Sequence, residues 1–527
     1  MKRRHAGMDD PSTTSQVQLP PISQPVAGPP AKATRDRSIE NRRRIEAAAL
    51  ALFTTQGFHG TNNREIAAQA GVSTAAIYLH YSSKEAIFVD LVQKHRAKID
   101  EWFEQSVTGL KDPFSKRDLK LFASMVWSKM REDREYLLLV LIDVIEFKNG
   151  HFAEFFHDMP NRLRELLTES LEAVVQRPNW RGHDPAFVLA AMYNYFFHSA
   201  LLGNYMQGER HLGVADELAI GRFVDLISDG LLSSPSKPPQ NQPGHTGPAI
   251  ARPRVFDQAA RERIEIIRLL CGRLWNPPPE ILARLSGKKA DRPAPKVSIL
   301  FLPEIGRDRP DDNQLAIEAA ALELFTTQGF HGTHIRDIAK RANCSQGTIY
   351  TYFPKKELIF ESLAHSYQNC MIRFMRQIIT SLHDPFSQND LRLLAWAVRS
   401  IVYDDSPYIL LMFIDVVEFK NQYFAELFRD LPGRFRHLLG STLDNMETRP
   451  GWCGLDPGLA FTTIYFFFFN YFVIEGHMRG NQHLGAPDDE VIEGLIDLLS
   501  SGLWLTEAEL AVDTSPGRPI RRPKAPL

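Results

Sequence analysis

Apolar residues recur three and four positions apart along most of the chain, and no stretch alternates between apolar and polar residues as a β-strand would. In residues 38–56, for example, Ile45, Ala49 and Phe53 fall on one face of a helix. Glycine and proline interrupt the pattern where helices are expected to end. The sequence therefore predicts an all-α fold.

A ten-residue segment, LFTTQGFHGT, occurs at residues 52–61 and again without change at 324–333, an offset of 272. The same offset relates IDVIEFKN at 142–149 to IDVVEFKN at 414–421. The register does not slip over the whole of the repeat, from about residue 41 to residue 232. We therefore predict two tandem helical units of about 190 residues each, with roughly nine helices per unit.

The repeat and the composition of the segments around it divide the chain into seven parts. Pro-, Ser- and Gln-rich sequence predicts a disordered N-terminal arm at 1–36, and Pro- and Arg-rich sequence predicts a disordered basic tail at 506–527. A linker at 233–312 begins with a Pro-rich run and contains an amphipathic helix at about 256–275. The other parts are a DNA-binding headpiece at 37–92 with a helical core at 93–232, and a second headpiece at 313–364 with a second core at 365–505.

Helix start and stop signals near the beginning of each unit predict a helix-turn-helix, whose second helix enters the major groove of DNA. In the first unit, we expect Ser38 and Gly57 to bound the first helix and Thr61 to cap the second. Ser73 should cap a short third helix, and residues 82–85 (SSKE) form a capping box for the fourth.

The block from Leu52 to Phe88 resembles the N-terminal DNA-binding signature of the TetR family of bacterial regulators. The resemblance lies in T-x-x-R-x-I-A, S-x-x-x-I-Y and K-E at fixed spacing. The block from Leu324 to Phe360 is similar to the same signature and has the family's Gly-Thr pair at 347–348. The resemblance implies a sequence-specific DNA-binding transcription regulator that acts as a repressor. It also implies that the helical cores pair and bind a small effector.

By that resemblance, the third helix of each unit lies in the major groove, with phosphate contacts at its edges. Thr74, Ala75 and Ala76 would face the bases in the first unit. Gln346, Gly347 and Thr348 would do so in the second, where the glutamine can pair with adenine. Tyr78 and Tyr350 are expected to contact the DNA backbone, and the alternative is that each only packs against the protein. The other expected DNA-binding residues are Arg43, Thr61, Arg64, Ser73, Tyr78, His80 and Lys84, and Thr333, Arg336, Ser345, Tyr350, Tyr352 and Lys356.

The two units differ where DNA contact is expected. The first has three consecutive arginines at 42–44, a basic arm that the second lacks. The turn has Gly71 in the first unit and Asn343 in the second, and asparagine also tolerates the left-handed conformation. We therefore expect an asymmetric DNA site, with Gln346 and Thr348 reading one half and the arginine-armed first headpiece binding the other.

The resemblance also implies that the last two long helices of each unit pair, here 186–206 and 216–232 with 458–478 and 488–504. One chain could then form an intramolecular pseudo-dimer, and the alternative is a homodimer of fused chains with four headpieces. Aromatic and polar residues on these helices predict a site for a small apolar effector, and their alternative role is the interface itself. The candidate ligand residues are Tyr193, His198, Tyr465 and Asn470.

The composition is 44% hydrophobic and 24% charged, with a net charge of −2, which excludes a broadly basic nucleic-acid coat protein. Specific DNA binding needs only a local basic patch. The four cysteines form no CxxC pair, so we expect no metal site and no cofactor. We find no phosphate loop and no nucleophile beside a base, and we interpret Asp143 and Glu146 as a solvated face or an interhelical salt bridge. The chain is therefore not expected to be an enzyme.

The most apolar run, Phe461 to Ile474, is about fourteen residues and too short to cross a bilayer. The N-terminus also lacks the apolar stretch of a signal peptide. We expect a bacterial cytoplasmic protein, associated with the nucleoid when it binds DNA, and no membrane partner. The leading prediction is a repressor on double-stranded operator DNA. The alternative is an interaction scaffold in which one or both headpieces no longer bind DNA.

Overall fold

The computed structural model describes residues 31–154, 159–205, 216–231, 312–404, 406–478, 484 and 486–503. All regular elements in these ranges are helices, in agreement with the predicted all-α fold. The first half contains α1 (Ala31–Gly60), α2 (Asn63–Ala70), α3 (Thr74–Tyr78), α4 (Lys84–Thr108), α5 (Lys116–Glu132), α6 (Arg134–Phe147), α8 (Met159–Val175), α9 (Pro185–Tyr205) and α10 (Asp216–Leu231).

The second half repeats this order, and the stretch that matches the kinked helix α8 is divided there into α19 and α20. It contains α13 (Asp312–Gly332), α14 (Ile335–Ala342), α15 (Gln346–Tyr352), α16 (Lys356–Thr380), α17 (Gln388–Asp404), α18 (Ser406–Glu418), the 3₁₀ helix η2 (Ala425–Phe428), α19 (Leu431–Leu439), α20 (Ser441–Asp444), α21 (Pro457–His477) and α22 (Asp488–Leu503). The predicted amphipathic helix at 256–275 and the tail at 506–527 lie outside the described residues.

The first helix begins earlier than the sequence pattern predicts. Helix α1 starts at Ala31, so Ser38 lies inside it and does not cap it. Residues 31–36, which were expected in a disordered arm, are helical. The end of the helix is closer to expectation, because Gly57 has φ 73° and ψ 175° and bends the backbone there. That combination is open almost only to glycine, which explains its presence at the bend.

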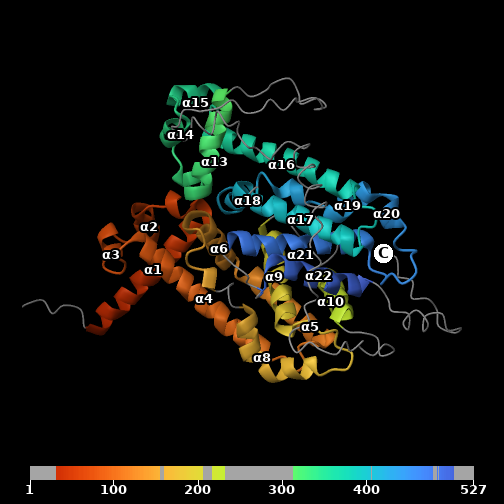
Figure 1. The fold of residues 1–527 in the computed structure, drawn as a ribbon. Coiled ribbons are helices and arrows are strands. Elements are labelled where there is room, and N and C mark those ends of the chain that lie inside the picture. Colours follow the sequence, from red (N-terminus) through yellow and green to blue (C-terminus); the bar gives the residue numbers. More distant parts are fainter. Residues whose placement is uncertain are drawn as a thin grey trace, which may run out of the picture.

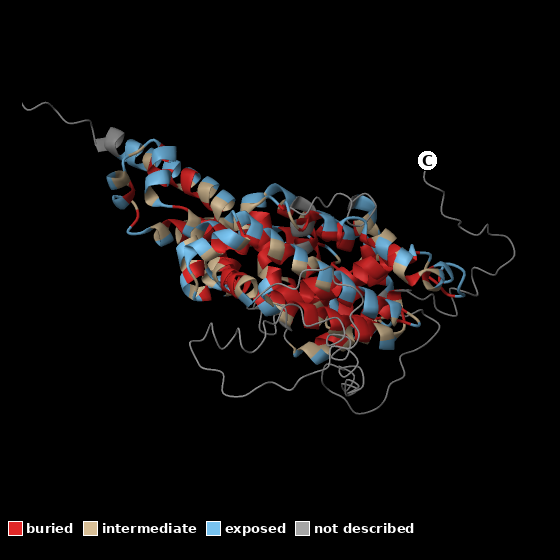
Figure 2. Cartoon of the chain, turned by 90° about the horizontal axis from the view of Figure 1, so that it is seen from above, coloured by how far each residue is buried: buried red, intermediate tan, exposed pale blue. Residues whose placement is uncertain are grey.

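The four helices expected to pair the two units are present within one or two residues of their predicted bounds. In the structure, α9 packs against α21 and α10 packs against α22 (Figure 1). At their centre the ring of Tyr195 stacks on Phe223 at 4.0 Å, and both rings lie 5.7 Å from Phe467 of the other half. The aromatic residues of these helices therefore form the contact between the halves. Figure 2 shows that buried residues run through the interior of the packed helices.

The halves also meet where the identical decapeptides end. Helix α1 packs against α13, and each also contacts α18 or α6 of the other half. A Cβ atom added to Gly60 would lie 2.6 Å from the Cβ of His331, and one added to Gly332 would lie 2.6 Å from the Cβ of His59. Only a residue without a side chain permits so close an approach. Beyond this contact, α2–α3 and α14–α15 extend in different directions (Figure 1).

Helix α21 corrects the expectation about membrane spans. It has 21 residues, so it is long and apolar enough to cross a bilayer, although its most apolar run is shorter. Among the described helices, it is the one that meets this criterion. Its most apolar window is fully buried inside the protein, as expected of a core helix packed on all sides.

Candidate nucleic-acid interface

Helices α2 and α3 form the predicted helix-turn-helix of the first half. Gly71 ends α2 in the left-handed conformation, with φ 62° and ψ 39°. The cap of α2 lies one residue later than predicted, because the side chain of Asn62 accepts the N–H groups of Arg64 and Glu65 at 3.0 and 3.1 Å. The carboxylate of Glu65 accepts the N–H of Asn62 in return, at 3.2 Å. A complete capping box therefore holds the start of this helix.

The predicted cap residue, Thr61, has a different role. It is buried, and its hydroxyl donates to the Gly57 carbonyl at 2.8 Å. Thr333 is buried in the same way and donates to the Gly329 carbonyl at 2.7 Å. In this conformation both hydroxyls close the turn between two helices, and neither lies at the protein surface.

Helix α3 has the serine cap that the sequence predicts, since Ser73 Oγ accepts the N–H of Ala76 at 3.1 Å. Ile77 is buried under the helix, Thr74 and Ala76 are half-buried, and Ala75 is exposed. Tyr78 is 57% exposed, and its hydroxyl accepts a hydrogen bond from Asn63 at 3.1 Å. His80, which follows the helix, is half-buried. The exposed face of α3 thus carries small residues beside one tyrosine.

Helix α15 presents a more polar face in the second half. Asn343 takes the left-handed turn conformation at φ 53°, as predicted, and Ser345 caps the helix through the N–H of Thr348 at 3.0 Å. Gln346 and Gly347 are exposed and Tyr350 is 50% exposed. Thr348 and Tyr352 are half-buried, and the Thr348 hydroxyl also lies 2.9 Å from Ser345 Oγ.

Lys84 and Lys356 begin the helices after each helix-turn-helix, where the sequence predicts a phosphate contact. The Lys84 ammonium donates to the carbonyls of Phe58 and Thr61, both at 2.6 Å, and lies 4.1 Å from the centre of the Phe58 ring. Lys356 makes the same contacts in the second half. Burial lowers the pKa of both ammonium groups. In this conformation each lysine fastens the start of its helix to the preceding turn.

The arginines of the predicted basic arm differ in their contacts. Arg42 pairs with Glu46 at 3.0 Å and with Asp90 at 2.9 Å, and Arg44 donates to the Gly71 carbonyl at 3.2 Å. Arg43 is exposed and forms no ion pair or hydrogen bond with a described residue. It is therefore the member of the arm that is available to bind a phosphate group.

Arg64 and Arg336 occupy matching positions on the first helix of each helix-turn-helix, α2 and α14. The Arg64 side chain is exposed and has no ion pair with any residue in the described ranges. The matching Arg336 is also exposed, and its guanidinium lies 3.6 Å from Asp337. Helix α14 also carries Lys340, which is exposed, and Arg341, which pairs with Glu323 at 2.6 Å, so the second half has more basic residues on this helix than the first.

Glu146 and Glu418 join the headpieces to the cores, a role that sequence analysis missed. Glu146 accepts the N–H groups of Phe58 and His59 at 2.7 and 2.6 Å and also pairs with the His59 ring. Glu418 accepts the N–H groups of Phe330 and His331 at 2.8 and 2.6 Å. The near identity of IDVIEFKN and IDVVEFKN was the available signal.

The expected solvated face is wrong for this segment, although the expectation of an interhelical salt bridge is met by Glu146 and His59. The Glu146 side chain is only 2% exposed. Asp143 is completely buried and accepts the N–H groups of His151 and Phe152 at 3.0 and 3.1 Å. The two carboxylates thus bind different parts of the chain and do not form a catalytic pair.

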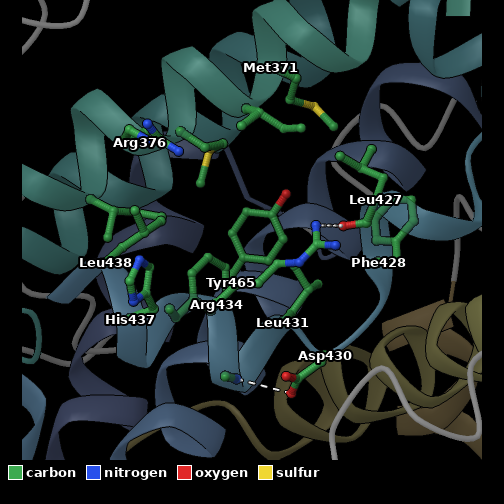
Figure 3. A pocket seen from close by; sticks show the side chains of 15 residues that line it. Met371, Arg376, Leu427, Phe428, Asp430, Leu431, Arg434, His437, Leu438 and Tyr465 are labelled. Atoms are coloured by element: carbon green, nitrogen blue, oxygen red, sulfur yellow. Dashed lines mark hydrogen bonds between the residues drawn. The ribbon is translucent and has the colours of Figure 1, made fainter. Parts of the chain in front are cut away.

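A cavity of about 570 Å³ opens between α16 and α19 in the second core (Figure 3). Tyr465, a predicted ligand residue, lines it from α21. The other predicted ligand residues lie elsewhere. Tyr193 is buried against the Phe103 ring, and Asn470 is buried at the contact between the halves, where its amide donates to the Tyr195 carbonyl at 3.3 Å. The side chain of His198 lies outside the described residues.

No group of three or more His, Cys, Asp or Glu side chains in the described ranges is arranged to hold a metal ion.

A family model described as "Bacterial regulatory proteins, tetR family" matches the chain twice, at residues 45–91 and 317–363. These matches cover the two helix-turn-helix regions, with the end of the preceding helix and the start of the following one.

Similar proteins with curated descriptions are transcription regulators. "HTH-type transcriptional regulator AcrR" of Shigella flexneri is 30% identical over 150 residues, which are 28% of this chain and 66% of the relative. "Probable acrEF/envCD operon repressor" of Escherichia coli K12 is 27% identical, over 26% of this chain and 65% of the relative. "Uncharacterized HTH-type transcriptional regulator YerO" of Bacillus subtilis is 25% identical, over 25% and 46%. The chain thus matches between about half and two thirds of the length of these relatives.

Proposed function

Because the chain belongs to the TetR family of bacterial regulatory proteins and carries two of the family's units in tandem, we propose that it is a repressor that binds an operator with both headpieces. The observation that carries this proposal is the pair of short helices α3 and α15. Each is capped by a serine and presents a half-exposed tyrosine beside small or uncharged residues. A helix of this kind fits the major groove of DNA. The relative described as an operon repressor supports the sign of regulation.

We propose further that one chain forms the pair of units that two chains form in other family members. Packing of α9 on α21 and of α10 on α22 supports this, because equivalent helices of the two halves meet each other. Their contact is built from large aromatic rings, which supply much apolar area per residue. The protein would then act in the cytoplasm as an intramolecular pseudo-dimer.

The proposed operator is asymmetric. Gln346 on α15 can pair with the edge of an adenine, whereas Ala75 and Ala76 on α3 offer only apolar contact. Arg43 and Arg64 give the first headpiece two exposed arginines without an ion pair among the described residues, which can bind the phosphate backbone. One half-site is therefore read mainly through bases and the other is held mainly through phosphates.

Mobility-shift titration and footprinting on genomic fragments test this proposal. Gln346→Ala should weaken operator binding about tenfold or more and relax the base preference in one half-site, because a bidentate base contact is lost. Tyr78→Ala and Tyr350→Ala should each weaken binding.

Arg43→Gln should reduce the slope of log affinity against log salt by about one. Arg429→Gln, which removes an exposed arginine of the second core, is the control and should change neither quantity.

Three results would contradict parts of this proposal. Loss of binding with Tyr78→Ala but not with Tyr350→Ala would contradict the two-headed arrangement. No shift on any fragment at low salt would overturn the regulator proposal and favour the interaction scaffold. A footprint with identical half-sites would contradict the asymmetric operator.

We also propose that a small effector releases the protein from its operator. The cavity in the second core supports it, since its volume lies within the usual range of ligand pockets. Glu146 and Glu418 supply a connection, because each carboxylate joins a core helix to the end of the first headpiece helix. An effector that shifts these helices relative to each other would change the spacing of the headpieces.

A further inference from the structure

The cavity between α16 and α19 differs chemically from the matching place in the first core. Its walls are mainly apolar, with Met371, Ile372, Met375, Ile379 and Phe428 among them. Figure 3 shows the labelled side chains of both helices directed into the space between them, with Arg434 near its centre and Arg376 toward one end. The site thus combines an apolar body with cationic groups.

In the first core, the equivalent of Arg434 is already neutralised. This residue is Arg162, and its guanidinium bonds the Asp100 carboxylate at 2.5 Å and the Asp100 carbonyl at 3.3 Å. It also lies 5.3 Å from the centre of the Phe103 ring. An arginine with a carboxylate partner and an aromatic ring below it has little positive charge left to offer a ligand.

In the second core that carboxylate is missing, because Ile372 stands where Asp100 stands in the first. Arg434 instead donates to two backbone carbonyls, those of Glu426 at 2.8 Å and Leu427 at 3.2 Å. It forms no ion pair with any described residue. Carbonyl oxygens carry no net charge, so this exposed arginine lies at the wall of the cavity without a paired carboxylate among the described residues.

Two more positions that hold an acid in the first core do not hold one in the second. Arg376 replaces Glu104, and His437 replaces Glu165. Asp430 is the acid that lines the cavity, and its carboxylate caps α19 through the N–H of Gly433 at 3.2 Å. The substitutions thus remove three acids from one place and add a cation there, whereas the arginine at its centre is kept.

We propose that this cavity binds an amphipathic anion, a molecule with one carboxylate on an apolar body, and that the first core does not. Arg434 pairs with the carboxylate, and the apolar side chains of α16 and α19 surround the rest. This deepens the effector step of the proposed function and rests on it only for the release of DNA. The two halves then differ in function, since the effector site lies in the second half, whose helix α15 is also proposed to read the bases.

Isothermal titration calorimetry of the full chain with decanoate, and with 1-decanol as the uncharged analogue, tests the proposal. Decanoate should bind at one site per chain, and 1-decanol should bind at least tenfold more weakly, because it lacks the charge that Arg434 pairs with. Equal affinities, two sites per chain, or no binding of decanoate would overturn the proposal.

Variants locate the site. Arg434→Gln should weaken decanoate binding about tenfold to a hundredfold, the usual value of a charge-assisted hydrogen bond. Ile372→Asp places the acid of the first core beside Arg434 and should abolish binding. Arg162→Gln is the matched control and should leave the affinity unchanged. Circular dichroism checks that each variant is folded, and Arg376→Gln gives a second measurement if Ile372→Asp does not fold. Binding that is insensitive to Arg434→Gln would place decanoate elsewhere and overturn the proposal.

The titration uses no DNA, so its result is separate from that of the regulator proposal. If decanoate binds as expected but no genomic fragment is shifted, the ligand site stands and the regulator proposal fails. If fragments are shifted but decanoate binds neither core, the ligand proposal fails and the regulator proposal stands.

Discussion

His477 lies at the end of α21, at the position that Tyr205 holds at the end of α9. It is buried, with its ring 6.2 Å from that of Phe413 and its Nε2 3.3 Å from the Val402 carbonyl. Burial lowers the pKa of His477 to about 4, because the charged form loses its water. The folded protein therefore holds this ring neutral at a pH where the unfolded chain protonates it.

The stability of the second core should accordingly fall in mild acid. Above pH 6.5 the His477 ring is neutral in both the folded and the unfolded state. Between pH 6.5 and 4 only the unfolded state gains a proton on this ring, which lowers the free energy of unfolding by up to about 3 kcal/mol. Urea unfolding from pH 4 to 7.5 would measure this loss, and His477→Phe should remove it. His365→Gln changes an exposed histidine and is the control. An equally steep loss in His477→Phe would contradict the assignment.

The three arginines at 42–44 show how much about single side chains could be predicted from the sequence. Three adjacent arginines predicted a basic surface, but two of them bond to Glu46, Asp90 and the Gly71 carbonyl. Asp90 and Gly71 lie 48 and 27 positions from the arginines that they bind, so the tertiary structure is needed to identify Arg43 as the arginine without such a partner. Thr61 and Lys84 are similar cases, since their local motif was correct but their side chains turn toward backbone carbonyls.

At the scale of helices, local signals were sufficient for most boundaries. Gly71, Ser73 and Asn343 all have the predicted conformation or cap, because turn chemistry depends mainly on neighbouring residues. The predicted start of α1 at Ser38 was wrong, because the helix continues without a break back to Ala31. The role of Glu146 could not be predicted, because its partners are 87 and 88 positions away.

The bend at Gly57 provides a test of the connection between headpiece and core. A Cβ atom there would lie 2.5 Å from Glu146 Oε1, and the backbone has φ 73° and ψ 175°. Gly57→Ala should therefore destabilise the protein by about 1–3 kcal/mol. Chemical denaturation measures the effect. Gly221→Ala lies in α10 with nothing within 4 Å of the added atom, so it should be neutral or slightly stabilising. Equal effects of the two substitutions would contradict the role of the bend.

At the scale of the whole molecule, the internal repeat predicted that the chain contains two equivalent sets of helices. It did not predict that the second core has a cationic cavity where the first has an ion pair. That difference depends on which side chains meet between α4 and α8 or between α16 and α19, and periodicity carries no information about such contacts.

The contact between α9, α10, α21 and α22 should hold the halves together without the linker. A protease site inserted between residues 233 and 311 allows this to be measured. After cleavage, the two fragments should elute together in size-exclusion chromatography, at the mass of one chain. Phe467→Glu places a charge against Tyr195 and Phe223 and should separate them. Separate elution of the unsubstituted fragments would show that the linker, and not the helix contact, joins the halves.

The close approach of Gly60 to His331 and of Gly332 to His59 has a consequence for the history of the duplicated sequence. Each copy of LFTTQGFHGT is a neighbour of the other, as in the self-complementary interface of a twofold dimer. A substitution in one copy changes the surroundings of the other, so neither can drift alone. Gln346 and Ala75 are exposed and have no such mutual constraint. The exposed residues of α3 and α15 can therefore diverge between the halves while the two joining segments stay the same.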